Sequence, residues 1–209
     1  MEKKTKYLFK DKILNIYITR HPEVENYDKN VFNGTIDVDL SKKGYKQANK
    51  IYEFFLDKNI EYVISSPLKR CSVVAEKFKN RAKILYDERI RERNFGIFES
   101  LSWEEIERLY PNDAKAFLKD PFNYKVKNGE SFADVRRRVL DFIDDTLLDI
   151  KSNILIVAHG GVNRVFISHL LEMSEKSILK ISQDYACINH FQTDGSFFLC
   201  KLINGKVNL

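Results

Sequence analysis

The sequence predicts an α/β protein: a three-layer α/β/α sandwich with a mostly parallel central sheet. Short apolar, β-branched runs alternate with helical segments, as in parallel sheets that are covered on both faces. Thr193-Asp194-Gly195-Ser196 separates two further β-rich runs and signals an antiparallel hairpin at the sheet edge. The 209 residues are 44% hydrophobic and 31% charged, which suits one domain of ordinary size. We therefore expect residues 1–209 to form a single domain, with a small helical cap inserted at about 100–130.

The first half of the chain predicts three strands and two helices. The strands are expected at 13–19, 62–65 and about 82–86. Ser41 is the expected N-cap of a helix over 42–57, in which apolar residues recur at helical spacing: Tyr45, Ala48, Tyr52 and Phe55. Ser66-Pro67 indicates the cap and first turn of a second helix, which ends near Phe78.

The second half predicts more helices, one strand and the hairpin. Ser102-Trp103-Glu104-Glu105 is a capping-box pattern that opens a helix ending before Pro111, and a short helix follows at 113–119. A long helix is expected over 131–149, with an apolar stripe of Phe132, Val135, Val139, Phe142 and Thr146. The remaining predicted elements are a strand at 153–158, a helix that starts at Gly160-Gly161 and ends near 171, and hairpin strands at 185–192 and 197–203.

Charge and composition argue against several classes of protein. The sequence has 35 Lys and Arg against 30 Asp and Glu, a net charge of +5 with both signs interspersed, so we expect no nucleic-acid binding. No apolar run approaches the ~18 residues of a membrane span, and the charged start lacks a signal-peptide core. Cys71, Cys187 and Cys200 are widely spaced, which favours a reducing compartment over a metal site. We expect a soluble, cytoplasmic protein that does not associate with membranes.

Two histidines follow predicted parallel strands directly. Arg20-His21 comes after the first strand, and His159-Gly160-Gly161 after the strand at 153–158. Because ligands of open α/β sheets bind at the carboxyl ends of the strands, these residues should share one crevice with Arg70. Arginine binds phosphate oxygens bidentately, and glycines at a helix start let backbone N–H groups approach an anion. The pattern predicts a phosphoryl pocket, and no Walker-type loop or magnesium-binding carboxylate cluster accompanies it, so a histidine is free to act as the nucleophile.

Six motifs occur in a characteristic order. They are Arg20-His21, Gly34 with Asp37 and Leu40, Ser65-Ser66-Pro67-Leu68-Lys69-Arg70, Glu92-Arg93-Asn94-Phe95-Gly96, Gly129-Glu130-Ser131 and His159-Gly160-Gly161. In this order they resemble the histidine phosphatase superfamily, the phosphoglycerate mutase-like proteins, and within it the branch of small-molecule phosphatases. The resemblance extends from about residue 13 to residue 171.

The resemblance implies a role for each matched residue. His21 would be the nucleophile that forms a phosphohistidine, and Glu92 would protonate the leaving alcohol. His159 would be the second catalytic histidine, and the phosphoryl oxygens would be bound by Arg20, Arg70, His159 and the backbone at Gly160. His21 must then be neutral, with its second ring nitrogen donating to a backbone carbonyl. The resemblance implies neither a metal nor a cofactor.

Three positions depart from the family pattern. Pro22 follows the nucleophile where glycine is usual, so a backbone donor is lost there. Tyr27 and Tyr185 stand where many relatives have asparagine, and Asn26 lies one place early. The sequence therefore leaves the contacts to the substrate open.

Residues and resemblance together predict a metal-independent phosphomonoester hydrolase of a small phosphorylated metabolite. The stretch from Glu92 to His159 is short compared with that of typical mutases, which favours water as the phosphoryl acceptor. One alternative is a cofactor-dependent phosphoglycerate mutase. The other is a non-catalytic phosphate-binding or interaction module, for which Pro22 would be a sign of lost activity.

The cap and the final hairpin suggest further contacts. Aromatic and basic side chains of the cap could grip the leaving group or could simply pack the cap onto the domain: Phe117, Phe122, Tyr124, Lys115, Lys119, Lys125 and Lys127. The hairpin could pair with a second copy of the chain, so a homodimer is one expected assembly.

Overall fold

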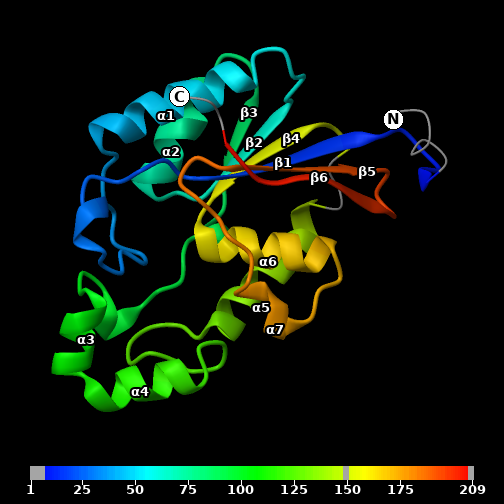
Figure 1. Cartoon of the computed structure of the whole chain (residues 1–209). Helices are drawn as coiled ribbons and strands as arrows, with labels where there is room; N and C mark the ends of the chain where they lie inside the picture. Colours follow the sequence, from blue (N-terminus) through cyan, green and yellow to red (C-terminus); the bar gives the residue numbers. More distant parts are fainter. Residues whose placement is uncertain (1–7, 148–150, 207–209) are drawn as a thin grey trace.

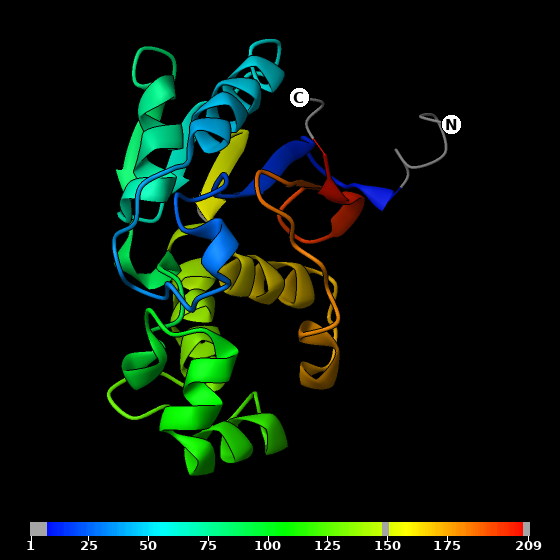
Figure 2. The same ribbon diagram turned by 60° about the vertical axis from the view of Figure 1, so that its left-hand side comes forward.

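A six-stranded sheet with helices on both faces forms the body of the structure (Figures 1 and 2). The computed structural model describes residues 8–147 and 151–206. The strands are β1 (Leu14–Arg20), β2 (Tyr62–Ser65), β3 (Lys83–Tyr86), β4 (Ile154–Ala158), β5 (Ile188–Thr193) and β6 (Phe198–Gly205). Their order is β3-β2-β4-β1-β5-β6, in which β1 to β4 run parallel and β5 and β6 form an antiparallel edge pair. The predicted fold class is confirmed.

The helices cover the two faces of the sheet in pairs. One face carries α1 (Lys42–Phe54) and α2 (Lys69–Ala75), and the other carries α5 (Phe132–Phe142) and α6 (Gly160–Leu170). Figure 2 shows α3 (Trp103–Leu109) and α4 (Pro111–Lys119) away from the sheet, beyond α5. A short helix, α7 (Glu175–Ile178), contacts α6. The 3₁₀ turns are Tyr27–Lys29, Glu76–Phe78, Glu88–Ile90 and Gly96–Phe98.

Alternating strand residues fill two separate cores. Ile16 and Ile18 of β1 belong to the core under α5 and α6, whereas Tyr17 belongs to the core under α1 and α2. All five residues of β4 are buried, because its two neighbours are strands and both of its faces are covered by helices. This burial on both sides explains why the strands are continuous apolar runs.

The first helix is capped as predicted, and most of its predicted stripe is confirmed: Ala48 and Phe55 are buried and Tyr52 packs against the same core. The Ser41 side chain accepts a hydrogen bond from the Gly44 N–H at 2.9 Å. The buried positions of α1 are Gly44, Gln47, Ala48 and Ile51. Tyr45 is instead exposed and donates its hydroxyl to Asp39 at 2.7 Å. The amphipathic tyrosine lies at the rim of the buried face, which apolar spacing alone does not reveal.

The long helix of the second half changes its winding near its end. Ser131 and Asp134 form a capping box, and the predicted stripe from Phe132 to Phe142 is buried. A π-helical turn then spans Ile143–Leu147, so Ile143 and Leu147 are buried and Thr146 is only partly buried. The wider turn shifts the helical register, and a uniform 3.6-residue period misplaces residue 146. The remaining two residues of the predicted helix, 148 and 149, lie outside the described residues.

Three further elements differ from the expectation. Pro111 is the first residue of α4, so this helix begins two residues early. The short helix α7 was not predicted. Strand β5 begins at Ile188 rather than at 185, because Ala186 has a φ of 58° and the chain turns there.

The segment with α3 and α4 has a small core of its own. Its buried members are Phe98, Ile106, Ala114 and Val126. Arg93, which is only 3% exposed, joins the loops at the base of this segment. Its guanidinium donates to the carbonyls of Pro121, Tyr124 and Glu130. One buried cation thus holds irregular backbone that has no sheet or helix partner.

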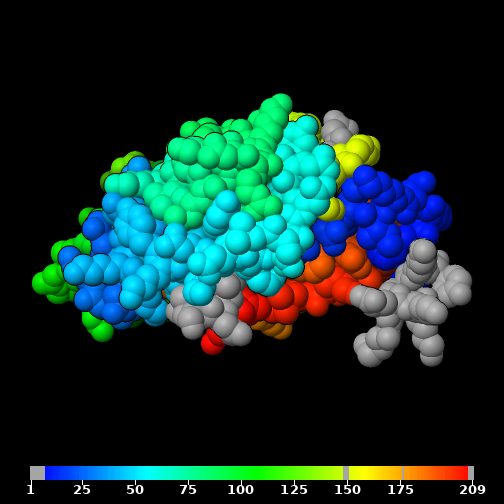
Figure 3. All heavy atoms as spheres, turned by 90° about the horizontal axis from the view of Figure 1, so that it is seen from above, coloured from blue at the N-terminus to red at the C-terminus, as the bar shows by residue number. Residues whose placement is uncertain are grey.

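Strand β6 lies at the margin of the face covered by α1 and α2 (Figure 3). Near this edge, Phe197, Leu202 and Ile203 are exposed by 38–40%. Within residues 8–147 and 151–206, no helix has the length and apolar character needed to cross a membrane.

Truncation of Phe166 should destabilise the fold strongly. This α6 side chain is completely buried and contacts Phe142 of α5 edge-on, with ring centroids 5.8 Å apart. We expect Phe166→Ala to lower the free energy of unfolding by about 3–5 kcal/mol in urea titrations. Leu118→Ala, at a side chain 62% exposed, is the control and should change it by less than about 0.5 kcal/mol. Equal losses in both variants would contradict this account of the core.

Candidate active site

The carboxyl ends of the parallel strands bring four of the six predicted site residues together. Arg20, His21, Arg70 and Glu92 line one cavity of about 170 Å³, and the rest of its wall is Val31, Phe32, Asn33, Gly34, Phe95 and Tyr185. His159 and Gly160 are buried and do not line this cavity. The His159 ring centroid lies 5.2 Å from that of His21, so the two imidazoles are neighbours.

The His21 ring is held in one orientation by its own backbone segment. The His21 N–H donates to the Ala158 carbonyl at 2.9 Å, which ties the residue to the end of β4. Nδ1 lies 2.8 Å from the carbonyl oxygen of Pro22. Because a carbonyl can only accept, Nδ1 carries the proton of the neutral ring and Nε2 keeps a lone pair. The backbone acceptor expected for the second ring nitrogen is therefore present. It is the carbonyl of Pro22, the residue that has no backbone N–H of its own.

The surroundings of His21 keep its imidazole neutral. The side chain is 5% exposed, and burial is the main reason that its pKa lies well below the ordinary 6.5. The positive charges of Arg70 and Arg20 lower this pKa further. A neutral histidine with a free Nε2 is the form that can attack phosphorus.

Two arginines line the cavity, and backbone carbonyls of neighbouring loops hold their guanidiniums. Arg70 is 1% exposed and donates to the carbonyls of Ile36 at 2.8 Å and Gly34 at 2.6 Å. Arg20 donates to the Gln183 carbonyl at 2.6 Å, and its Cζ lies 4.0 Å from the Tyr185 ring centroid. In both, Nε is buried without a hydrogen-bond partner in the described part of the chain. Such donors are costly unless an acceptor reaches them, and a phosphoryl oxygen is one.

The loop before α1 shapes the opposite wall. Gly34 has a φ of 50°, and a Cβ there would clash with the Glu99 carboxylate. The Asn33 amide exchanges two hydrogen bonds with Asn26, at 2.7 and 3.0 Å. Sequence reasoning missed Asn33, although Asn-Gly is a turn signal that could have drawn attention to it.

Two of the three positions that depart from the family pattern, Tyr27 and Tyr185, lie near the cavity that contains His21. Tyr27 is 51% exposed and, with Asn26, lines a neighbouring cavity of about 270 Å³. Tyr185 lines both cavities and its ring centroid lies 5.5 Å from that of His21. Tyr185 therefore borders the site, whereas Tyr27 and Asn26 do not line the cavity that contains His21.

Ser66 contacts His159 and does not cap a helix. The N-cap of α2 is Leu68, without a side-chain hydrogen bond, so the predicted cap at Ser66-Pro67 is wrong. Ser66 Oγ instead lies 2.8 Å from His159 Nε2, and Cys71 Sγ lies 3.5 Å from the same nitrogen. Burial raises the pKa of the Cys71 thiol to about 12, so it stays protonated. Burial, followed by the nearby cations, lowers the pKa of His159 well below 6.5.

Glu92 is fixed by backbone donors from both sides. The Arg93 N–H donates to Oε1 at 2.9 Å, and the Gly161 N–H donates to Oε2 at 3.1 Å. A Cβ on Gly161 would lie 2.5 Å from Oε1. The second glycine after His159 thus makes room for the carboxylate and binds it. A Cβ on Gly160 would make only ordinary contacts, 3.6 Å from both Arg20 Nε and Arg164 Nη1.

A third cavity, of about 250 Å³, continues from Glu92 toward the segment with α3 and α4. It is lined by Phe32, Glu92, Arg93, Phe95, Phe117, Pro121, Phe132, Gly161, Arg164 and Leu179. Of the cap residues expected to grip a substrate, only Phe117 lines it. Phe122 packs on Phe132, and the Tyr124 hydroxyl donates to Asp113. The four cap lysines are exposed and line neither this cavity nor the one that contains His21.

Arg164 brings a third guanidinium to this region. Its Nε donates to the Ile181 carbonyl at 2.7 Å. Burial is the main cause of a lowered pKa, and the nearby Arg20 charge acts in the same direction. In the part of the chain that the structure describes, no group of three or more His, Cys, Asp or Glu side chains is arranged to hold a metal ion.

Comparison with known proteins agrees with this geometry. The model of the "Histidine phosphatase superfamily (branch 1)" matches residues 16–206. "Putative phosphoserine phosphatase 2" of Hydrogenobacter thermophilus is 28% identical over 182 residues, which cover 86% of this chain and 90% of that protein.

Two solved structures share the fold. The α-ribazole phosphatase of Shigella flexneri superposes with a TM-score of 0.86 at 23% identity, covering 92% of this chain and 96% of that one. The phosphoserine phosphatase of Entamoeba histolytica, solved with 3-phosphoglyceric acid, gives 0.79 at 24% identity, covering 92% and 98%.

If Glu92 is the general acid that the family resemblance implies, Gly161→Ala should impair turnover of an alkyl phosphate through Glu92. The added Cβ displaces the carboxylate, and a positioned general acid is worth about 10²–10⁴-fold, so we expect kcat/KM to fall on the order of 10²-fold. In a Glu92→Ala background the clash no longer exists, and the same substitution should then cost less than about threefold. A full additional loss in that background would show that Gly161 acts by another route.

Proposed function

The chain belongs to branch 1 of the histidine phosphatase superfamily, and from this premise we propose that it hydrolyses a phosphate monoester of a small metabolite through a phosphohistidine on His21. The observation that carries the proposal is the neutral, buried His21, whose Nδ1–H is held by the Pro22 carbonyl beside two arginines. Nε2 is thereby left for the attack. The segment at 100–130 is a cap over this pocket in the proposed arrangement.

In the first half-reaction His21 displaces the alcohol. The Nε2 lone pair forms a bond to phosphorus as the bond from phosphorus to the alkoxy oxygen breaks. Arg20 and Arg70 bind the equatorial oxygens and stabilise their charge, whereas His159, which does not line the cavity, supports the neighbouring His21 ring 5.2 Å away between centroids. Glu92, protonated at this stage, gives its proton to the leaving oxygen. The products of this step are the free alcohol and the phosphohistidine.

In the second half-reaction water takes the place of the alcohol. The Glu92 carboxylate accepts a proton from the water that attacks phosphorus, and the phosphorus–Nε2 bond breaks. Inorganic phosphate leaves, and His21 and protonated Glu92 are restored. A mutase would differ only in passing the phosphoryl group to a second substrate hydroxyl.

The test is hydrolysis of p-nitrophenyl phosphate with excess chelator present. We expect the wild type to release p-nitrophenol under these conditions and His21→Ala to lose the activity by at least about 10³-fold, because the nucleophile is gone. Acid quenching of wild type should trap acid-labile phosphate that His21→Ala lacks.

Three outcomes would contradict parts of the proposal. Loss of activity with chelator and its return with a divalent metal would contradict the metal-independent route. Phosphate trapped on His21 that passes to an added phosphoglycerate but not to water would indicate the mutase. Binding of phosphate with no trapped intermediate would indicate a non-catalytic module.

We further propose that the alcohol portion of the substrate carries an anionic group. The cavity beyond Glu92 has aromatic walls and contains Arg164, whose terminal nitrogens have no partner among the described residues. A poorly solvated cation of this kind favours a carboxylate or phosphate as its ligand. The Hydrogenobacter relative carries the name of a phosphoserine phosphatase, and phosphoserine has such a carboxylate.

Arg164→Ala should therefore discriminate between substrates. A hydrogen bond to a charged group contributes about 1.5–3 kcal/mol, so kcat/KM for phosphoserine should fall on the order of 10- to 100-fold. The alcohol portion of p-nitrophenyl phosphate carries no anionic group, so kcat/KM for this ester should change by less than about threefold. Arg164→Lys should restore part of the loss. Equal losses with both esters would exclude Arg164 as the site of an anionic group.

A further inference from the structure

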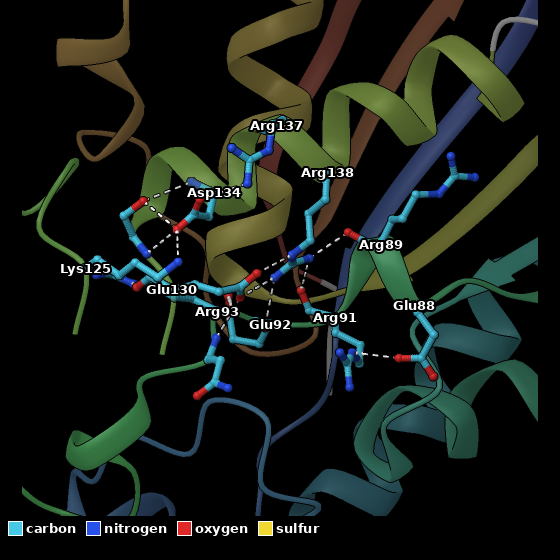
Figure 4. Close-up of polar contacts among 12 residues, drawn as sticks. Glu88, Arg89, Arg91, Glu92, Arg93, Lys125, Glu130, Asp134, Arg137 and Arg138 are labelled. Carbon is cyan, nitrogen blue, oxygen red and sulfur yellow. Dashed lines mark hydrogen bonds and ion pairs between the residues drawn. The ribbon is translucent and has the colours of Figure 1, made fainter. Parts of the chain in front are cut away.

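Arg138 and Glu130 form a hydrogen-bond network around the backbone segment that carries Glu92 (Figure 4). Arg138 lies on α5, and its side chain is 19% exposed. Its Nη1 donates to the carbonyls of Arg89 at 2.6 Å and Arg91 at 2.7 Å, and its Nη2 donates to the Glu92 carbonyl at 3.0 Å. One side chain therefore binds three carbonyls within four residues.

The same guanidinium is paired with a carboxylate. Arg138 Nε donates to Glu130 Oε1 at 2.9 Å, and Nη2 donates to Oε2 at 3.0 Å. Together with the three carbonyls, these bonds use all five N–H groups of the guanidinium. A lysine, with three donors and no planar fork, could not replace it.

Glu130 extends the network to the other side of Glu92. Its Oε2 accepts the Asn94 N–H at 2.9 Å, and its own N–H donates to the Asn94 carbonyl at 2.8 Å. Burial alone would raise the pKa of this carboxyl, but the bonds and charge of Arg138 lower it below the ordinary value. Glu130 thus stays ionised and holds Arg138 in place.

The enclosed segment has no regular structure to fix it otherwise. After the 3₁₀ turn Glu88–Ile90, residues 91–95 belong to no helix or strand. Backbone bonds hold the segment from the Glu130 N–H to the Asn94 carbonyl and from the Arg91 N–H to the Glu88 carbonyl, and side-chain partners add further bonds. The angle at which Glu92 enters the cavity therefore depends on Arg138 and Glu130, which touch neither the cavity nor the reacting atoms.

We propose that Arg138, held by Glu130, is the positioning residue for the general acid: it aligns Glu92 with the leaving oxygen by fixing the carbonyls of Arg89, Arg91 and Glu92. This inference rests on the proposed function. With this backbone fixed, the Glu92 carboxylate is held in the one rotamer that accepts hydrogen bonds from the N–H groups of Arg93 and Gly161. Loss of the network would weaken proton transfer while leaving the arginines that bind phosphate in place.

Leaving groups that differ in their need for a proton provide the activity test. An alkoxide such as that of phosphoserine must be protonated as it departs, whereas p-nitrophenolate leaves without help. For Arg138→Met we expect kcat/KM with phosphoserine to fall on the order of 10- to 100-fold, which is part of the rate enhancement that a general acid supplies. With p-nitrophenyl phosphate we expect kcat/KM to fall by less than about threefold. Glu130→Gln should show the same pattern, and Arg138→Lys a milder one.

The matched control is Arg137→Ala. Arg137 is the next residue on α5, 73% exposed and bound to Asp134, and it should affect neither ester. In a Glu92→Gln background, Arg138→Met should add little, because the two residues act on one step. A loss of equal size with both esters, or no loss with either, would overturn the proposal. If Arg138→Met does not fold, Arg138→Lys and Glu130→Gln carry the same test.

A second readout does not require any turnover. The Gly161 N–H is bonded to Glu92 Oε2, so its hydrogen exchange reports whether the carboxylate is held. We expect faster exchange of this amide in Arg138→Met and unchanged exchange in Arg137→Ala. Unchanged exchange in Arg138→Met would overturn the positioning role even if the wild type hydrolysed no ester. If the Gly161 amide exchanges faster in Arg138→Met but the wild type hydrolyses no ester, the positioning of Glu92 by Arg138 is supported and the proposed function is rejected.

Discussion

The site depends on one electrostatic constraint: a neutral imidazole lies beside two arginines that form no salt bridge with a described carboxylate, although Glu92 lines the same cavity. Burial and the charges of Arg20 and Arg70 hold the pKa of His21 far below its usual value. A carboxylate placed next to either arginine would remove much of this effect and would occupy the donors. The fold instead gives both guanidiniums carbonyl acceptors from neighbouring loops and leaves each Nε buried without a partner. The positive charge of these arginines favours an anion in the cavity.

Arginine side chains also bind loop carbonyls that have no backbone partner in the sheet or the helices. The strands end where irregular loops must turn, and those loops have carbonyls that no ladder satisfies. Arg70 binds the loop at 34–36, Arg93 binds the base of the cap, and Arg138 binds the segment at 89–92. A guanidinium suits this task because its planar fork reaches several acceptors at fixed angles. Of these three, only Arg70 and Arg93 also line a cavity.

Periodicity and strand ends in the sequence predicted the strands and part of the site. The prediction failed for residues whose partners are distant in the chain. The apolar runs located β1, β2 and β4, which are largely buried, and also the partly exposed strand β3, and strand ends placed Arg20 and His21 at the end of β1. Ser66 has the local pattern of a helix cap, yet its hydroxyl contacts His159, 93 positions away. Gly161 looks like half of an anion-binding pair, but its neighbour in space is Glu92. Such contacts depend on the packing of β4 against β2 and on the path of the segment after β3, and no local pattern contains that information.

In the proposed mechanism, phosphate binding and proton transfer depend on side chains that are attached to different parts of the fold. The two arginines of the proposed phosphate site are bonded to other loops: Arg70 to the carbonyls of Gly34 and Ile36, and Arg20 to the Gln183 carbonyl, which precedes β5. The acid is bound to the first turn of α6 through Gly161 and to α5 through Arg138 and the segment it encloses. α5 and α6 pack together through Phe142 and Phe166, so both attachments of Glu92 belong to one helical layer. Substitutions in that layer can alter how the leaving group is protonated without altering how the phosphoryl group is held. A cavity that opens from Glu92 along this same layer is then where differences in substrate should be accommodated, because its wall can change without moving His21.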